Sequence, residues 1–264
     1  MLMRPMVRGY KLVSILLLLA LASGCATVSA PNKRDPWESY NRSIFEFNQG
    51  FDNAIGKPVA EAYQYVLPNF MQTGITNFFN NLNDIVVIVN DFLQFKFTQG
   101  LADLNRLVYN TTFGLLGFID VASHMDLPKH NEDFGQTLAV WGVGSGPYFV
   151  LPFLGPNTVR DTTGLIVDTV YLNPLVNLKD DEIRWGLIAL SAIDKRASLL
   201  EASRIMEKSG IDPYVFMRNA YFQVRENQIY DGNPPGKKYN IKPTQDDLEL
   251  EQELEKELQL EAPK

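Results

Sequence analysis

The sequence predicts an all-α fold, and three observations carry that prediction. An Asp-Pro pair occurs at residues 35–36 and again at 212–213. This pair is typical of a helix start, because the carboxylate caps free backbone N–H groups and proline fits the first helical position. Apolar residues recur at helical spacing through residues 181–208. Outside residues 148–154, no clear run alternates apolar with polar side chains as a half-buried strand does.

The expected helices follow one another with short connections. Asp35 should cap the first helix, Pro36 should occupy its first position, and Glu38 lies where the carboxylate of a capping box belongs. Helix signals predict the ranges 36–54, 58–66, 69–97, 100–112, 115–124, 132–141, 157–171, 181–208 and 214–228. In the third range, the asparagines between residues 80 and 83 are a candidate break.

Residues 1–24 have the pattern of a bacterial lipoprotein signal peptide. Basic residues come first, and the apolar segment 12–22 follows. That segment is too short to span a bilayer, which takes about 20 apolar residues, but it suits a cleaved signal. Small residues then lead into Cys25, the only cysteine of the chain. We expect cleavage before Cys25 and a diacylglycerol plus an N-acyl chain on it, with no other cofactor; an ordinary secretory signal with an incidental cysteine is the alternative.

The cleaved chain divides into three parts. Ala26 follows the cysteine at a place where aspartate favours inner-membrane retention, so we expect the outer membrane, with the protein facing the periplasm. Residues 25–34 form a lipidated tether of at most about 30 Å. Residues 35–230 form a helical domain, and residues 231–264 form a Pro/Gly linker with an acidic tail that we expect to be flexible. The tail is either a solvated acidic segment or a docking segment for a basic periplasmic partner.

The segment 78–97 has helical periodicity with unusual proportions. Six polar residues fall within a sector of about 120° on the helical wheel, and nearly all the others are apolar. The six are Asn80, Asn83, Asp84, Asn90, Asp91 and Gln94. Two interpretations stay open: a nearly buried helix of a globular domain whose stripe reaches the surface, or a membrane-embedded helix that turns its stripe toward a wet channel.

A glycine- and proline-rich segment follows at residues 141–161. Its glycines give backbone freedom, and its prolines disfavour a continuous helix or a central strand. An apolar loop of this kind either fills a core or contacts lipid. The residues concerned are Gly142, Gly144 and Gly146, followed by Tyr148, Phe149, Leu151, Phe153 and Leu154.

Composition and motifs argue against several other functions. The net charge is −7 and becomes more negative once the basic leader is removed, so nothing indicates a nucleic-acid footprint. Ser145 lies between two glycines, but at the wrong offsets for the nucleophile elbow of a serine hydrolase. His124 and His130, the only histidines, do not have zinc-ligand spacing. We therefore expect neither an enzyme nor a metal site.

Short motifs in a fixed order give the chain a family resemblance. They are Cys25, Asp35-Pro36-x-Glu38, Asn41-Arg42, Phe45-x-Phe47-Asn48, Lys57-Pro58, Asn110-x-Thr112-x-Gly114, Phe134-Gly135-x-Thr137-Leu138, Gly146-Pro147-Tyr148, Leu151-Pro152, Gly155-Pro156 and Arg160-Asp161. On these motifs, most of the chain between residues 35 and 230 resembles the MlaA (VacJ) family of outer-membrane lipoproteins.

This resemblance implies a ring of helices embedded in the periplasmic leaflet of the outer membrane, with a central amphipathic channel. It implies extraction of misplaced phospholipids from the outer leaflet and their transfer to a soluble periplasmic carrier of an ATP-driven inner-membrane complex. Such retrograde transport would maintain lipid asymmetry, and a trimeric outer-membrane porin is the implied partner. The polar stripe would line the channel, and the segment 142–154 would gate it. The alternative is a porin-associated structural lipoprotein that moves no lipid.

Overall fold

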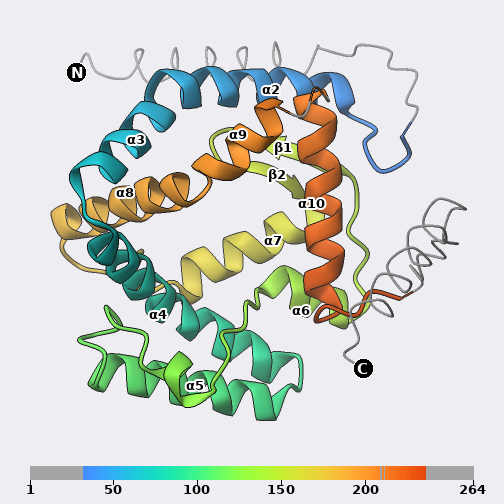
Figure 1. Cartoon of the computed structure of the whole chain (residues 1–264). Coiled ribbons are helices and arrows are strands. Elements are labelled where there is room, and N and C mark those ends of the chain that lie inside the picture. The colour runs from blue at the N-terminus through green and yellow to red at the C-terminus, as the bar shows by residue number, and fades with distance from the viewer. Residues whose placement is uncertain (1–31, 209, 211, 236–264) are drawn as a thin grey trace, which may run out of the picture.

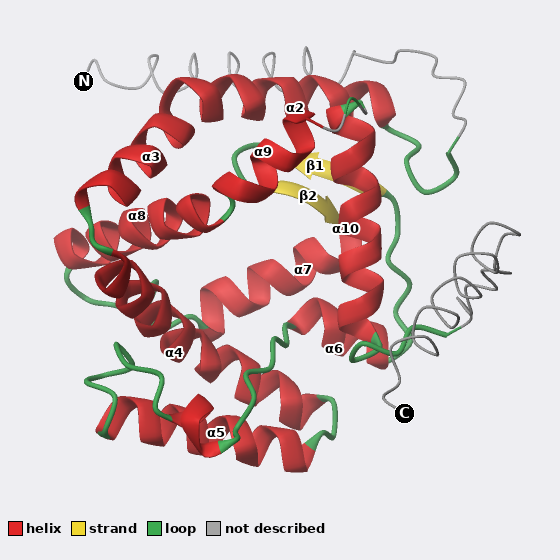
Figure 2. Ribbon diagram, viewed as in Figure 1, coloured by secondary structure: helices red, strands yellow, loops and turns green. Residues whose placement is uncertain are grey.

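The helices of the protein are arranged in a ring (Figure 1). The structure is a computed structural model that describes residues 32–208, 210 and 212–235. α2 (Glu38–Phe51) forms one edge of the ring, and α5 (Phe97–Thr112) forms the opposite edge. Among the described residues, Figure 2 shows only one pair of short strands beside the helices, which confirms the all-α expectation. The signal peptide, Cys25, most of the tether and the tail beyond residue 235 lie outside the described residues.

The first edge of the ring is one continuous helical segment. α2 passes through η1 (Asp52–Gly56), a π-helical turn, directly into α3 (Lys57–Val66), so the two helices expected here are joined. Asp52 in this turn accepts hydrogen bonds from Arg196 Nε at 2.6 Å and Nη2 at 2.8 Å, which ties the turn to α8 (Asp181–Ser198). The segment ends in extended backbone at Leu67, as expected for a residue before proline.

Asp35 does not cap α2, contrary to the prediction. The helix begins at Glu38, and Asp35 is fully buried before it. Its carboxylate accepts hydrogen bonds from Asn41 Nδ2 at 2.8 Å and from Arg218 Nη1 at 2.7 Å. A long-range ion pair has therefore replaced the local cap. The second Asp-Pro pair behaves as predicted, because Asp212 caps α10 (Pro213–Ile229) through the backbone N–H of residue 214.

α4 (Asn69–Leu93) runs unbroken through residues 80–83 and packs against α5. The helix predicted at 115–124 is wrong. Leu115, Leu116 and Gly117 have φ values of +54°, +59° and +93°, so the chain turns here instead of continuing as a helix. A Cβ at Gly117 would lie 2.4 Å from the Cβ of Asn81, so the turn needs glycine to approach α4. Only a short 3₁₀ helix, η2 (Ala122–Met125), forms near this range.

A β-hairpin separates α6 (Phe134–Val140) from α7 (Val159–Val167). β1 (Tyr148–Leu151) and β2 (Gly155–Thr158) are antiparallel, with Tyr148 opposite Thr158. The helix predicted at 157–171 therefore starts later, at α7, and it ends in a second π-helical turn, η3 (Asp168–Leu172).

Three helices complete the ring. The helix predicted at 181–208 is interrupted at Leu199, between α8 and α9 (Leu200–Lys208). α8 contacts α3 and α4, while α10 contacts α6, α9 and β2 and so closes the ring beside the hairpin (Figure 1).

Polar groups dominate the buried positions of the fold. Among the described residues, nineteen polar or charged residues are buried, against eleven apolar ones. Soluble domains have the opposite preference. The buried apolar clusters are small, one around Ala60 and Leu200 and the other around Tyr148 and Tyr214. Within the described part of the chain, no helix combines the length and apolarity needed to cross a membrane.

Candidate functional site: a series of chambers inside the ring

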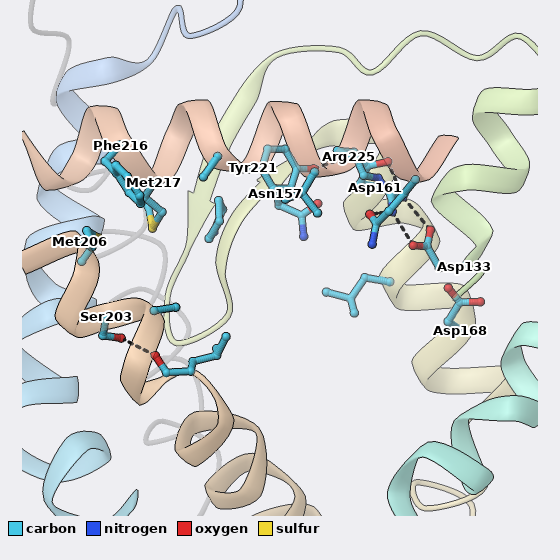
Figure 3. Close-up of a pocket in the computed structure, with 17 residues that line it drawn as sticks. Asp133, Asn157, Asp161, Asp168, Ser203, Met206, Phe216, Met217, Tyr221 and Arg225 are labelled. Carbon is cyan, nitrogen blue, oxygen red and sulfur yellow. Dashed lines mark hydrogen bonds and ion pairs between the residues drawn. The ribbon is translucent and has the colours of Figure 1, made fainter. Parts of the chain in front are cut away.

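A cavity of about 630 Å³ lies between α7, α9, α10 and the hairpin, and we call it the apolar chamber. Most of its wall is apolar, from Pro156, Leu165, Leu199, Ala202, Met206, Phe216, Met217, Ala220 and Val224. Figure 3 shows Met206 and Phe216 toward one end, whereas Asp133, Asp168 and Arg225 gather at the other. The chamber therefore has an apolar end and a polar end.

Arg225 and two carboxylates form the polar end. Arg225 Nη2 donates to Asp133 Oδ1 at 2.7 Å and to Asp161 Oδ1 at 2.9 Å. Tyr221 Oη and Thr158 Oγ1 donate to the other oxygen of Asp161, at 2.6 Å and 2.8 Å. Burial opposes ionisation of Asp161, but the hydrogen bonds and charge of Arg225, with the two hydroxyl donors, outweigh it and lower the pKa of Asp161 to about 2. Asp161 therefore stays charged at neutral pH.

A second cavity of about 290 Å³ adjoins this polar end, and we call it the acidic chamber. It lies between α4, α6, α7 and η3, and it shares Asp133, Leu165, Asp168 and Gln228 with the apolar chamber. Its other lining residues are Asn83, Val86, Asn131, Glu132, Gln136, Thr169 and Asn173. Of the described residues that line it, three are carboxylates and none is lysine or arginine.

A third cavity of about 440 Å³ continues between α4 and α8, and we call it the amide chamber. It shares Asn83, Val86, Asn131 and Asn173 with the acidic chamber. Its other lining residues are Thr76, Phe79, Asn80, Leu82, Pro174, Leu175, Ser191, Asp194, Lys195 and Ser198. Because neighbouring chambers share wall residues, the three form a connected series on the inner side of the ring.

The predicted polar stripe divides between this series and the helix packing behind it. Asn80 lines the amide chamber, and Asn83 lines the amide and acidic chambers. The remaining stripe residues line none of the three chambers and are buried; they are Asp84, Asn90, Asp91 and Gln94.

Two of these buried residues connect α4 directly to its neighbours. Asp84 forms an ion pair with Lys129. Asn90 Nδ2 donates to Asp168 Oδ1 at 3.1 Å, and Asn90 Oδ1 accepts from Thr137 Oγ1 at 2.8 Å. Asn90 therefore positions a carboxylate that lines the chambers, although it does not line them itself.

The last two residues of the stripe, Asp91 and Gln94, also bond to neighbouring segments instead of lining a chamber. Gln94 Nε2 donates to Glu132 Oε2 at 2.9 Å, and Asp91 Oδ1 accepts from Gln99 Nε2 at 2.7 Å. Burial and, after it, the neighbouring charge of Asp103 together raise the pKa of Asp91 to about 8. This part of α4 forms a layer behind the chamber wall.

Several chamber residues do not stand out in the sequence. Asp161 belongs to the short Arg160-Asp161 motif, which does not indicate a chamber. Asp133 lies where a loop meets α6, and Asp168 lies where α7 continues into η3. Arg225 is one of several polar residues on α10. No local periodicity marks these positions. Their common feature is convergence in space, which the sequence pattern does not encode.

The structure also divides the predicted gating segment. Tyr148 is fully buried, and Phe149 and Leu151 are partly buried in β1. At the turn of the hairpin, Phe153 and Leu154 are 64% and 67% exposed. Core filling, one of the two interpretations of the sequence, thus applies to Tyr148, while lipid contact at the exposed Phe153 and Leu154 stays a prediction.

The glycines of that segment precede the hairpin. Gly142 and Gly146 have φ values of +88° and +68°, which is left-handed backbone that glycine adopts without strain. A Cβ at Gly142 or Gly144 would meet nothing within 4 Å, so space does not require glycine at either position.

Comparison with known proteins places the chain in a family. The family model described as MlaA lipoprotein matches residues 33–228. The chain belongs to the MlaA family. A relative from Escherichia coli (strain K12), named intermembrane phospholipid transport system lipoprotein MlaA, is 37% identical over 247 residues, covering 90% of this chain and 96% of the relative. The protein of the same name from Haemophilus influenzae is 32% identical, covering 84% of this chain and 92% of the relative.

A solved structure agrees with the MlaA assignment. It concerns the structural basis for maintenance of bacterial outer membrane lipid asymmetry, and it matches this chain with a TM-score of 0.65 at 36% identity. The match covers 75% of this chain and 99% of that chain. All residues that line the three chambers fall within the part of the chain that the MlaA model matches. The chambers therefore belong to the MlaA domain itself.

Proposed function

We propose that this protein is an outer-membrane lipoprotein that extracts misplaced phospholipids from the outer leaflet. Lipids pass through the interior of the ring to a soluble periplasmic carrier, which delivers them to an ATP-driven inner-membrane complex. The observation that carries the proposal is the series of three chambers, in which apolar walls adjoin charged and amide walls. A phospholipid combines the same two chemistries in one molecule. The names of the MlaA relatives, which refer to intermembrane phospholipid transport, support a role in phospholipid transport.

An apolar stripe on the first edge of the ring supports embedding in the periplasmic leaflet. Phe47, Phe51, Ile55 and Val59 follow one another at four-residue intervals along α2, η1 and α3, and each is between 40% and 51% exposed. Four-residue spacing keeps these side chains on one side of the helix. Because about half of each side chain is already covered by protein, burying the remainder in hydrocarbon is worth about 1 kcal/mol for each of them.

A second stripe lies on the opposite edge. Phe97, Leu101, Leu104 and Val108 occupy one side of α5 and are 39–55% exposed. Exposed apolar surfaces of this extent mark membrane or protein contacts. We propose that lipid covers most of this surface and that a trimeric porin covers the rest. The acyl chains on Cys25 would add to the attachment.

Photo-crosslinking inside the apolar chamber tests the proposal. A benzophenone amino acid at Ala202, which lines the chamber, should capture phospholipid in cells. The same amino acid at Asn227, which is exposed on α10 and lines none of the three chambers, is the control and should capture little. Mass spectrometry of the purified protein identifies the adducts. An acylated, folded protein that captures no phospholipid at position 202 would instead be a porin-associated structural lipoprotein.

A further inference from the structure

We infer that the acidic and amide chambers together bind the zwitterionic headgroup of an amine-bearing phospholipid, of the phosphatidylethanolamine class. They disfavour phospholipids whose headgroup is only negatively charged. The inference rests on the proposed function and adds a headgroup preference to it.

The acidic chamber contains a buried carboxylate that forms no ion pair with any described residue. Asp168 is 8% exposed, and its oxygens accept hydrogen bonds from two neutral donors, Asn90 Nδ2 at 3.1 Å and the Phe134 backbone N–H at 2.8 Å. Burial raises the pKa of Asp168, because its charged form lacks a neighbouring cation strong enough to offset the loss of water. A ligand cation in the chamber would supply that charge.

The two other carboxylates of this chamber are paired with cations that do not line it. Glu132 accepts from Lys96 Nζ at 2.8 Å, and Asp133 accepts from Arg225. Neither Lys96 nor Arg225 lines the acidic chamber. Among the described residues, the wall that a ligand meets therefore presents carboxylates and no cation; Glu132 and Asp133 are paired from behind it, and Asp168 is not.

Gln136 provides an independent observation. Its side chain lines the acidic chamber and is 1% exposed. Its Nε2 donates to the Asn131 carbonyl at 2.9 Å and to Asp133 Oδ2 at 3.2 Å, but its Oε1 accepts no hydrogen bond from the described residues. A buried acceptor without a donor is unfavourable. A primary ammonium has three N–H donors, so it can serve this oxygen and a carboxylate at once.

The adjoining amide chamber offers the complementary chemistry. Four asparagines line it, and their side-chain N–H groups donate to no protein group within the described residues; they are Asn80, Asn83, Asn131 and Asn173. Lys195 is also in this wall, as is Asp194, whose carboxylate accepts hydrogen bonds from Tyr63 Oη and Thr76 Oγ1. Amide and ammonium donors suit the oxygens of a phosphate. Since the two chambers share three of these asparagines, a headgroup can place its phosphate in the amide chamber and its ammonium in the acidic one.

The test compares headgroups in the intact protein. Full-length protein is reconstituted in vesicles of equal phosphatidylethanolamine and phosphatidylglycerol, extracted in mild detergent, and its bound lipids are quantified by mass spectrometry. We expect phosphatidylethanolamine to be enriched roughly fivefold or more. The chamber carboxylates attract its ammonium group, whereas phosphatidylglycerol has only negative charge to offer them.

A matched pair of charge variants sharpens the test. Thr169→Lys adds an ammonium to the wall of the acidic chamber and should abolish or invert the preference. Asn227→Lys adds the same charge at an exposed site on α10 and should preserve the preference. Circular dichroism verifies that each variant is folded.

The outcomes separate the inference from the proposed function. Equal recovery of both lipids by the unmodified protein overturns the headgroup preference and leaves lipid transport standing. Recovery of neither lipid contradicts the proposed function itself. If Asn227→Lys changes the ratio as much as Thr169→Lys does, net charge rather than the chamber sets the preference, and the inference is wrong.

Discussion

Asn41 and Asn48 lie seven residues apart on α2, about two helical turns, and hold successive parts of β1 with the same pair of hydrogen bonds. Asn41 Nδ2 donates to the Tyr148 carbonyl at 3.2 Å, and Asn41 Oδ1 accepts from the Val150 N–H at 2.9 Å. A side-chain amide has a donor and an acceptor on one carbon, so it can imitate the backbone of a neighbouring strand.

Asn48 repeats the arrangement at the end of the strand. Its Nδ2 donates to the Leu151 carbonyl at 2.9 Å, and its Oδ1 accepts from the Phe153 N–H at 2.8 Å. The ring of Phe153 also packs against Phe47 and Phe51, with centroids 5.3 Å and 5.0 Å away. α2 therefore occupies the free edge of β1 and fixes the hairpin beside the apolar chamber.

Removal of the first asparagine should destabilise the fold. Asn41→Leu leaves a buried N–H and a buried carbonyl of β1 without partners and removes a donor from Asp35, so we expect a loss of about 2–4 kcal/mol in the free energy of unfolding. Denaturant unfolding of the purified protein measures it. Ser43→Ala, at an exposed position of the same helix, should change little. Equal stability of the two variants would show that the asparagine bonds contribute nothing net.

Arg225 should determine how stability depends on acid. The folded pKa of Asp161, about 2, lies below its unfolded value of about 3.9, so ionised Asp161 stabilises the fold above pH 4, and that contribution is lost as pH falls toward 2. Arg225→Met removes the main cation, and we expect it to destabilise the protein at pH 7 by about 3–5 kcal/mol. Its stability should fall less steeply than that of the unmodified protein between pH 4 and 2.

A surface ion pair provides the control for that experiment. Arg204 pairs with Glu201, and both side chains are exposed, so Arg204→Met should change stability by less than about 1 kcal/mol and leave the acid profile unaltered. Unfolding followed at several pH values distinguishes the two variants. Identical acid profiles for both would contradict the role assigned to Arg225.

Two helical glycines should respond oppositely to alanine. A Cβ at Gly164 of α7 would lie 2.2 Å from the backbone nitrogen of Gly135 in α6, and backbone cannot yield easily. Gly164→Ala should therefore destabilise the protein by at least about 1–3 kcal/mol through overpacking. Gly186→Ala in α8 meets nothing within 4 Å and should stabilise by up to about 1 kcal/mol. Melting temperatures of both variants and the native protein measure these effects. A Gly164→Ala variant as stable as the native protein would refute the close α6–α7 contact.

Cys25 lies outside the described residues, but its predicted role is directly testable. Cys25→Ala removes the thiol that carries the diacylglycerol, so we expect no incorporation of labelled palmitate and retention of the signal peptide. Gel mobility and metabolic labelling measure both effects. Normal acylation of the variant would show that the lipid is attached elsewhere.

The sequence predicted those parts of the fold that depend on local periodicity. α4, α5 and α10 were located to within a few residues because their apolar spacing and capping signals are contained in the helices themselves. The family assignment also followed from short local motifs and is confirmed.

Tertiary contacts decided what the sequence did not predict. The turn at Leu115–Gly117 depends on the close approach to Asn81. Asp35 does not cap α2 because its carboxylate accepts a hydrogen bond from Arg218 on α10. For the site, the stripe on α4 predicted six channel-lining residues, and two of them, Asn80 and Asn83, line the chambers. The carboxylates opposite them come from segments distant in the chain, and no pattern in a single helix could assemble them.

The central claim is that lipid passes through the apolar chamber. The most direct measurement is phospholipid exposure in the outer leaflet, read by palmitoylation of lipid A, in cells lacking the protein and complemented with variants. Ala220→Trp fills the chamber, whereas Asn227→Trp places the same bulk at an exposed site on the same helix. We predict that the native protein and Asn227→Trp restore low exposure, and that Ala220→Trp does not although it is folded and anchored. Full restoration by Ala220→Trp would contradict passage through this chamber.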